Sequence, residues 1–352
     1  MRLKGNVRSF SFYLFMAVVQ ISAFFGFFAH LPQGVTAYGI ILALPFAFVI
    51  SAVIMYFAFK LFDNYGSDTS KALKKGLPSS AIVYKYVLSV FLLLAAIITV
   101  MRYTDFVSEC INKEVSPVIL IFLTMCGVLY GSCKGLEAMC GANGIIFTVC
   151  VILLTVLFIG LIPQISIDEG TVAGFSETGI FSVLSSLVYL ISGLSTLPLC
   201  IILSEKSKGN NRRSAVSFLL IYYLTAIISV VFVIVCLGVF SLQENNPLYA
   251  LSKLSGMSVI EENDGLFFIV RTTFVFLELS GYAIGFSSLF ERSGSRKSSI
   301  VFCLLTFVIS EILYEFLKLR ADIFAYGIIF GMVLISVVAA VFFKRSVTGG
   351  TK

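Results

Sequence analysis

Long apolar runs, separated by short clusters of charged, Gly, Pro or Asn residues, dominate the sequence. A helix needs roughly 20 mostly apolar residues to cross about 30 Å of hydrocarbon, so each run is a candidate membrane span. Ten runs are present, over residues 10–31, 38–62, 81–104, 116–131, 143–163, 178–203, 215–242, 265–290, 299–317 and 322–343. They are continuously apolar instead of alternating, which favours helices over a β-barrel. The pattern predicts an all-α polytopic membrane protein with ten transmembrane helices.

The composition agrees with this interpretation. Of the 352 residues, 59% are hydrophobic and only 12% are charged, with a mean hydropathy of +1.01. Soluble domains carry about 25% charged residues. A soluble enzyme, a disordered chain and a disulfide-stapled secreted module are therefore excluded. We expect residues 1–352 to form a single membrane domain, and the first run to be a span instead of a cleaved signal peptide, because nine further runs follow it.

The distribution of Lys and Arg predicts the orientation of the chain. If the N-terminus lies in the cytoplasm, the inner segments hold 19 of the 25 basic residues and five acidic residues. Short cytoplasmic loops are enriched in Lys and Arg, so we expect both termini to lie inside. The net charge of +6 is then a topology signal and does not indicate a nucleic-acid partner.

Ten spans divide into two five-helix halves, residues 1–163 and 164–352, which have opposite orientations in the membrane. This 5+5 inverted repeat is typical of transporters whose leading helices are interrupted near the bilayer midplane. In the first span, Gln20, Ser22 and Gly26 are the polar and small residues at that depth. In the sixth, they are Ser192, Gly193, Ser195 and Thr196, followed by Pro198. We expect these two clusters to bind ligand, although small residues of this kind also serve close helix packing.

Three segments are similar to the spore germination permeases, the B subunits of nutrient germinant receptors. The stretch 129–139 contains Lys134-Gly135-Leu136-Glu137, which resembles the family's K-G-[ILV]-E turn after span four. Residues 165–168 and 276–283, the latter leading to 287–290, also resemble the family. The chain departs from the family pattern after Gly193, where relatives usually carry an acidic residue.

The resemblance implies a LeuT-like fold within the amino acid–polyamine–organocation superfamily. It also implies a location in a bacterial cell membrane, the inner membrane of the spore, and a role in germination. A small-molecule nutrient, an amino acid in class, is the expected ligand. The A-type and C-type receptor subunits are the expected protein partners, alongside the lipid bilayer.

Ionisable residues inside spans are costly and mark candidate sites. Glu278 lies at the centre of its span, where we expect the carboxyl to be held neutral and to ionise on meeting an ammonium, a cation or water. A structural hydrogen bond to a neighbouring helix is the alternative. Arg271 is seven residues earlier on the same face, and Arg102 lies near the end of span three. Either residue can pair with Glu278 or Glu311 or snorkel outward, and for Arg102 we expect snorkelling.

Other chemistry is poorly represented. Lys134 and Glu137 are three residues apart and can pair on one helix face, which is a structural role; the family resemblance implies a cytoplasmic gate at this turn. Arg271 and Glu278 are further candidates for gating or coupling. A single His permits neither a Ser/His/Asp set nor a His-based metal site, and no phosphate-binding loop or nucleic-acid module is present. We expect no cofactor and no enzymatic activity. The eight Cys residues are interpreted as small buried thiols.

The sequence favours two functions. The first is a receptor subunit that binds a nutrient in a transporter-like pocket and shifts a two-state equilibrium that partner subunits read. The second is a proton- or cation-coupled amino acid transporter that uses the same pocket. A scaffold that binds no ligand is a third alternative.

Overall fold

The computed structural model describes residues 7–28, 35–65, 78–111, 114–165, 174–175, 178–192, 196–203, 207–208, 211–242, 244, 246–255, 264–290 and 296–317. Ten α-helices lie in these ranges: α1 (Ser9–Phe28), α2 (Ala37–Tyr65), α4 (Pro78–Phe106), α5 (Pro117–Leu161), α7 (Ile180–Ser192), α8 (Thr196–Leu203), α9 (Asn211–Leu237), α10 (Pro247–Leu254), α11 (Asp264–Phe290) and α12 (Arg296–Leu317). Shorter elements are the π-helical η1 (Val107–Ile111), the 3-10 turns η2 (Ile162–Gln164) and η4 (Gly238–Leu242), and the strands β1 (Val7–Arg8) and β2 (Ser207–Lys208).

The described helices are those of a multi-pass membrane protein. Six helical stretches are long and apolar enough to cross a membrane: Ser9–Gly26, Lys85–Ile111, Pro117–Gln164, Val216–Leu237, Gly265–Phe290 and Arg296–Tyr314. Large apolar side chains are exposed along the outer helices, among them Phe46, Ile145, Leu224 and Leu304. Soluble monomers rarely expose contiguous apolar surface on this scale, so lipid is the solvent that suits these faces.

The predicted spans agree with the helices in part. Five of the runs each correspond to one helix: 10–31 to α1, 38–62 to α2, 81–104 to α4, 265–290 to α11 and 299–317 to α12. The run at 215–242 corresponds to α9 followed by η4. The run at 178–203 is described as two helices, α7 and α8, with residues 193–195 between them outside the described ranges. The run at 322–343 also lies outside them. The number of ten spans stays a prediction.

α5 contains the two runs predicted at 116–131 and 143–163. Its helical geometry is interrupted at Gly135, where φ is 83° and ψ is 174°. In the arm before Gly135, Gly131 lies close to Ser280, which is in the second half of α11. Near the end of the arm after Gly135, Gly160 lies close to Ser255, which precedes α11 in the chain. The two arms therefore run in opposite directions along α11, as expected of two consecutive spans. Glycine tolerates the positive φ that this reversal requires.

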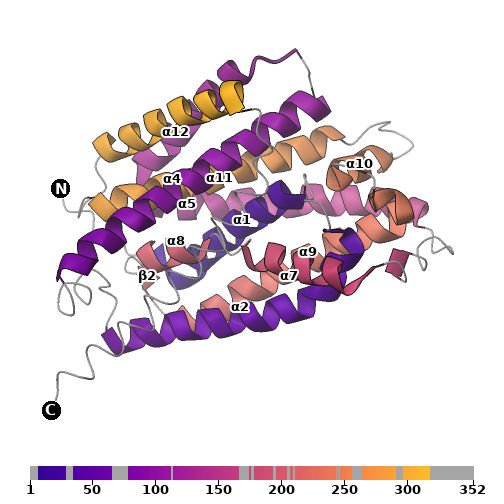
Figure 1. Cartoon of the computed structure of the whole chain (residues 1–352), viewed down its shortest axis with the longest axis horizontal. Coiled ribbons are helices and arrows are strands. Elements are labelled where there is room, and N and C mark those ends of the chain that lie inside the picture. The colour runs from indigo at the N-terminus through magenta and orange to yellow at the C-terminus, as the bar shows by residue number, and fades with distance from the viewer. Residues whose placement is uncertain are drawn as a thin grey trace.

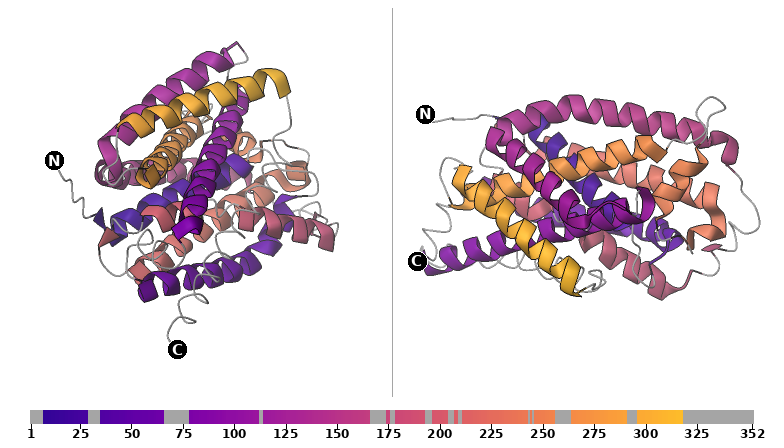
Figure 2. Two further views of the ribbon diagram at one scale, coloured as in Figure 1. Left: turned by 60° about the vertical axis from the view of Figure 1, so that its left-hand side comes forward. Right: turned by 90° about the horizontal axis from the view of Figure 1, so that it is seen from above.

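The helices form two groups, with α1 between them. In one group, α2 packs against α7 and α9; in the other, α4, α5, α11 and α12 pack against one another. Figure 1 shows α2 along the lower edge and α12 along the upper edge. α1 contacts α9 on one side and α11 and α5 on the other. The two views in Figure 2 show α12 crossing α4 obliquely.

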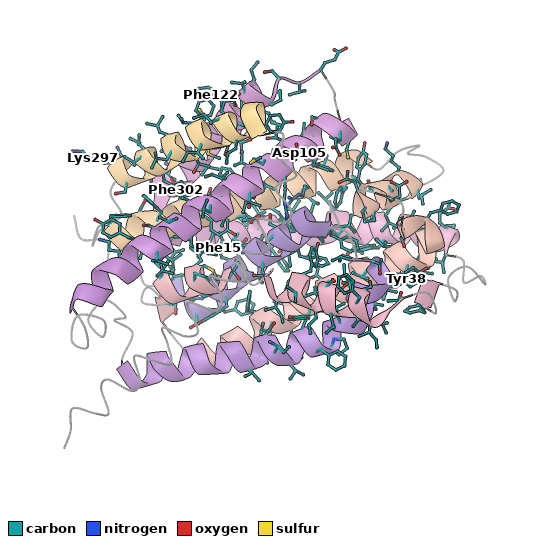
Figure 3. All side chains as sticks on the ribbon, in the orientation of Figure 1. Phe15, Tyr38, Asp105, Phe122, Lys297 and Phe302 are labelled. Carbon is teal, nitrogen blue, oxygen red and sulfur yellow. The ribbon has the colours of Figure 1, made fainter. Side chains whose placement is uncertain are left out.

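Segments predicted to lie on the same side of the membrane meet at the same end of the bundle. Val7 pairs with Ser207 in a short parallel β-ladder, which joins the start of α1 to the α8–α9 connection. Lys85 Nζ lies 4.6 Å from the ring centroid of Phe290, which joins the start of α4 to the end of α11. Lys297 and Tyr38, predicted on opposite sides, lie near opposite ends of the long axis in Figure 3.

The thiols are less uniformly buried than expected. Cys140, Cys150, Cys200 and Cys303 are buried, whereas Cys126 and Cys133, on the first arm of α5, are exposed. The expectation of buried thiols is wrong for these two, because this arm presents one face to the outside of the bundle.

Candidate functional site

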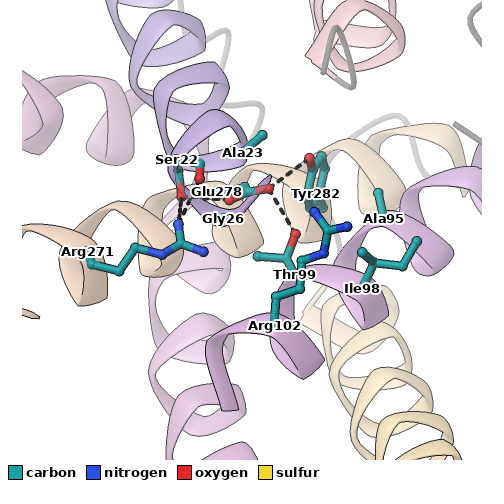
Figure 4. A pocket seen from close by; sticks show the side chains of 10 residues that line it. All are labelled: Ser22, Ala23, Gly26, Ala95, Ile98, Thr99, Arg102, Arg271, Glu278 and Tyr282. Atoms are coloured by element: carbon teal, nitrogen blue, oxygen red, sulfur yellow. Dashed lines mark hydrogen bonds between the residues drawn. The ribbon is translucent and has the colours of Figure 1, made fainter. Parts of the chain in front are cut away.

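A buried carboxylate occupies the middle of α11. Glu278 lies 14 residues after the first residue of this helix and is 1% exposed. Its Oε2 accepts a hydrogen bond from Ser22 Oγ of α1 at 2.6 Å. Its Oε1 accepts from Thr99 Oγ1 of α4 at 2.9 Å and from Tyr282 OH of α11 at 3.1 Å. Glu278 thus connects three helices (Figure 4).

Arg271 lies two turns earlier on the same face of α11 and is also 1% exposed. Its Nη1 donates to the main-chain oxygen of Ser22 at 2.7 Å and to Ser22 Oγ at 3.3 Å. Ser22 Oγ accepts from the guanidinium while it donates to Glu278. One serine of α1 therefore bridges a buried cation and a buried carboxylate, both of α11, and offsets part of the cost of burying them.

α1 is a continuous helix from Ser9 through Gly26 to Phe28, so it is not interrupted at Gly26. The sequence left two roles open for this glycine, a helix break and close packing, and the structure shows close packing. A Cβ built at this position would lie 2.5 Å from Arg271 Nη2. The glycine lets the backbone of α1 approach the guanidinium closely enough for Ser22 to bind it.

α4 supplies the third wall of the site. Thr99 faces Glu278, and Arg102 lies one turn further along α4. The prediction that Arg102 snorkels outward is wrong, since this side chain is only 6% exposed and lines the same cavity as Glu278. α4 continues without a gap into η1, which ends at Ile111, so Arg102 is an interior position of a longer helical segment than the sequence suggested.

These residues surround a small cavity. Ten residues line it: Ser22, Ala23 and Gly26 of α1; Ala95, Ile98, Thr99 and Arg102 of α4; and Arg271, Glu278 and Tyr282 of α11. Its volume is about 20 Å³. A cavity of that size holds about one water molecule and is too small for an amino acid. The described conformation is a closed one, and a larger solute requires the helices to separate.

The other predicted ligand residues do not join this cavity. Gln20 Oε1 accepts a hydrogen bond from Thr196 Oγ1, which connects α1 to α8 on another face of α1. Both side chains are buried. Ser192 is the last residue of α7, and Gly193 and Ser195 lie outside the described residues. The described members of the predicted set are therefore divided. Ser22 and Gly26 of α1 and Glu278 of α11 line the cavity, whereas Gln20 of α1 and Thr196 of α8 form a separate pair.

Lys134 and Glu137 do not line the cavity; they flank Gly135, where α5 is interrupted. Both are exposed. Their predicted pairing on one helix face is wrong, because Gly135 interrupts the helix between them. Lys134 Nζ lies instead 5.1 Å from the ring centroid of Tyr130. Their predicted role in gating stays a prediction.

Thr99 and Tyr282 are site residues that sequence reasoning missed. Hydroxyl side chains are common in membrane helices, so neither stands out alone. The available signal was their spacing relative to charged residues: Tyr282 is four residues after Glu278, one turn along the same face, and Thr99 is three residues before Arg102.

The site is suited to recognition by charge and hydrogen bonding. It places two guanidinium groups and one carboxyl group around one cavity, away from bulk water. Electrostatic interactions are strong in such surroundings. Among the described residues, no cluster of three or more His, Cys, Asp or Glu side chains is placed to hold a metal ion.

The comparisons with known proteins give no family for this chain. No family model matches the sequence, and no curated protein matches it.

Proposed function

We propose that this protein recognises a small nutrient, an amino acid in class, at the cavity between α1, α4 and α11. We further propose that it acts as the nutrient-binding membrane subunit of a spore germinant receptor. The observation that carries the proposal is the buried Arg271–Ser22–Glu278 set beside the cavity. Buried charges of opposite sign inside membrane helices are costly, and they mark solute or ion sites.

The position of the cavity supports a sensing mechanism. α1 packs with α9 on one side, whereas the cavity is closed by α4 and α11 on the other. A solute that enters must separate α1 from α11, because the cavity has room for only about one water molecule. Solute binding therefore favours an open arrangement over the closed one. A partner subunit that contacts either helix group would read that change.

The germination assignment rests on the resemblance carried by the Lys134–Glu137 turn, the segments 165–168 and 276–283, and the chain length. The reversal of α5 at Gly135 supports it, because the family motif is a turn between spans four and five. We propose ten spans with both termini inside, a LeuT-like 5+5 repeat, and assembly with A-type and C-type subunits in the spore inner membrane. Single cysteines placed at the exposed positions Lys297 and Phe175, the latter with its ring centroid 4.8 Å from that of Tyr38, should react in a Cys-free background with impermeant maleimide from opposite sides.

A coupled amino acid transporter is the second candidate. The location of the charged set between α1 and the group that contains α4 and α11 favours it, because alternating access moves helix groups around a fixed central site. The two functions differ in a measurable way: a transporter accumulates labelled amino acid in proteoliposomes, whereas a sensor binds it without net uptake.

The decisive experiment combines binding and uptake. Purified protein in detergent is screened with the twenty amino acids by thermal unfolding, and any that stabilises it is tested for uptake in proteoliposomes under proton and sodium gradients. We expect stabilisation without concentrative uptake. Concentrative uptake would replace the receptor with the transporter. The absence of binding by any amino acid would contradict both and favour a scaffold.

The same question can be asked in spores. A strain carrying Glu278→Gln should lose or shift its response to the nutrient, while the exposed substitution Arg296→Lys should leave it unchanged. An unaltered response in the Glu278 strain would remove this residue from the proposed site.

A further inference from the structure

We infer that the site recognises its solute through a carboxylate group, and that Arg271 is the residue that binds this group. The inference rests on the function proposed above and specifies which end of the nutrient is read. It reverses the expectation that Glu278 binds an amine.

The hydrogen-bond acceptors of Glu278 are largely occupied. A carboxylate offers about four acceptor positions. Three are filled by the hydroxyl groups of Ser22, Thr99 and Tyr282, at 2.6, 2.9 and 3.1 Å. These bonds come from α1, α4 and α11, so an ammonium group would have to displace contacts that hold the three helices together. Glu278 is thus built to connect helices and to balance the charge of Arg271.

The hydrogen-bond donors of Arg271 are largely unused. A guanidinium group carries five N–H donors. Only Nη1 is engaged, and both of its bonds go to Ser22. Nε is buried and has no hydrogen-bond partner among the described residues. Nη2 faces Gly26, which has no side chain to accept a hydrogen bond from it. Buried donors without partners are unfavourable, so this side of the guanidinium is prepared for an acceptor.

The free edge has the geometry of a carboxylate receptor. Nε and Nη2 lie side by side on one edge of the guanidinium plane, and two parallel N–H groups match the two oxygens of a carboxylate. Arg102 lines the same cavity. An incoming carboxylate would meet the unused donors of Arg271, whereas an amine would find no acceptor on a guanidinium group.

Binding at this edge also accounts for a coupled movement of α1. Nη2 lies so close to the α1 backbone at Gly26 that a Cβ built on this glycine would be only 2.5 Å from Nη2. A solute carboxylate that reaches Nη2 must take the place of the α1 backbone. Recognition of the carboxylate and separation of α1 from α11 are then one event.

The test compares molecules that share a carbon skeleton. In the first set, alanine carries both groups, propionate carries the carboxylate alone and ethylamine carries the amine alone. Leucine, 4-methylpentanoate and 3-methylbutylamine form a second set in the same order. Each acid and amine is assayed as a competitor of the labelled amino acid of its set, with the purified wild-type protein. We expect the acid to compete and the amine not to compete. Competition by the amine, or by neither analogue, would overturn the inference.

A variant then assigns the contact to Arg271. Arg271→Lys keeps the positive charge but cannot present two parallel donors, so we expect acid and amino acid to bind about 10- to 100-fold more weakly. Arg296→Lys, at the exposed start of α12, is the matched control. Unchanged binding in a folded Arg271→Lys protein would overturn the assignment. If neither amino acids nor acids bind the wild type, the proposed function fails as well; binding of amines alone contradicts only the present inference.

Discussion

The substitution Gly26→Ala tests whether this glycine exists to admit Arg271. A Cβ at position 26 would lie 2.5 Å from Arg271 Nη2, while ordinary contact begins near 3.4 Å. The guanidinium must therefore move by roughly 0.9 Å. A shift of that size along the 2.7 Å bond from Nη1 to the Ser22 oxygen would lengthen it to about 3.6 Å, which no longer qualifies as a hydrogen bond.

The energetic consequence follows from two opposing terms. A buried hydrogen bond to a charged group contributes about 1.5–3 kcal/mol. Replacing Gly by Ala in a helix contributes about 0.8–1 kcal/mol in the opposite direction. We expect Gly26→Ala to lower the free energy of unfolding by about 1–2 kcal/mol, measured by reversible denaturation in detergent.

Two control variants test whether the loss of stability comes from contact with the guanidinium. Gly141 lies in a helix with open space around its Cβ position, so Gly141→Ala should be neutral or stabilising. In an Arg271→Met background, where the obstructing group is absent, Gly26→Ala should lose its penalty, because contacting residues are not additive. If Gly26→Ala is as harmless as Gly141→Ala, or if its penalty persists without the guanidinium, the close-approach argument is wrong.

Three further substitutions follow from the described contacts, each measured as a change in unfolding free energy. Glu278→Gln leaves a buried cation without its counter-charge, and we expect a loss of about 3–5 kcal/mol; a loss below 1 kcal/mol would mean that the charge is not needed. Thr196→Val removes the hydrogen bond to Gln20 and should cost about 1 kcal/mol, and no effect would show that α8 does not depend on it. Gly135→Ala places a Cβ at a φ of 83° with no neighbour within 4 Å, so a cost of about 1–3 kcal/mol would be purely conformational; an effect as small as that of Gly141→Ala would contradict it.

The sequence predicted the charged part of the site because charge stands out against an apolar helix. Glu278 was predicted from its position at the centre of its apolar run, and Arg271 from its place seven residues before Glu278 on the same helix face. Ser22 was predicted as a polar residue in the first span. Arg102 was misplaced for a physical reason: the apolar run ends at 104, but the helical segment continues through η1 to Ile111. A position near the edge of a run can therefore lie well inside the helix that contains it.

The role of Gly26 could not be read from the sequence, because a glycine serves equally well for a helix break and for a close approach. What separates the two is the neighbour, and Arg271 lies 245 residues away along the chain. The same holds for Lys134 and Glu137, whose spacing suits a helix pair until Gly135 reverses the chain between them. Local spacing is informative only where the backbone between the residues is regular.

The contacts of α1 explain why a solute at this site would act on helix arrangement. Gln20 and Ser22 are two residues apart, which places them on nearly opposite faces of α1. Gln20 joins α1 to α8 by one hydrogen bond between neutral groups, while Ser22 joins it to α11 through a carboxyl and a guanidinium. Charge-assisted bonds are roughly twice as strong as neutral ones, so the closed state is held mainly on the α11 side. A carboxylate that binds Nε and Nη2 displaces the α1 backbone at Gly26, so it pulls on that stronger attachment and leaves the weaker one intact. α1 would then move together with α8, away from α11.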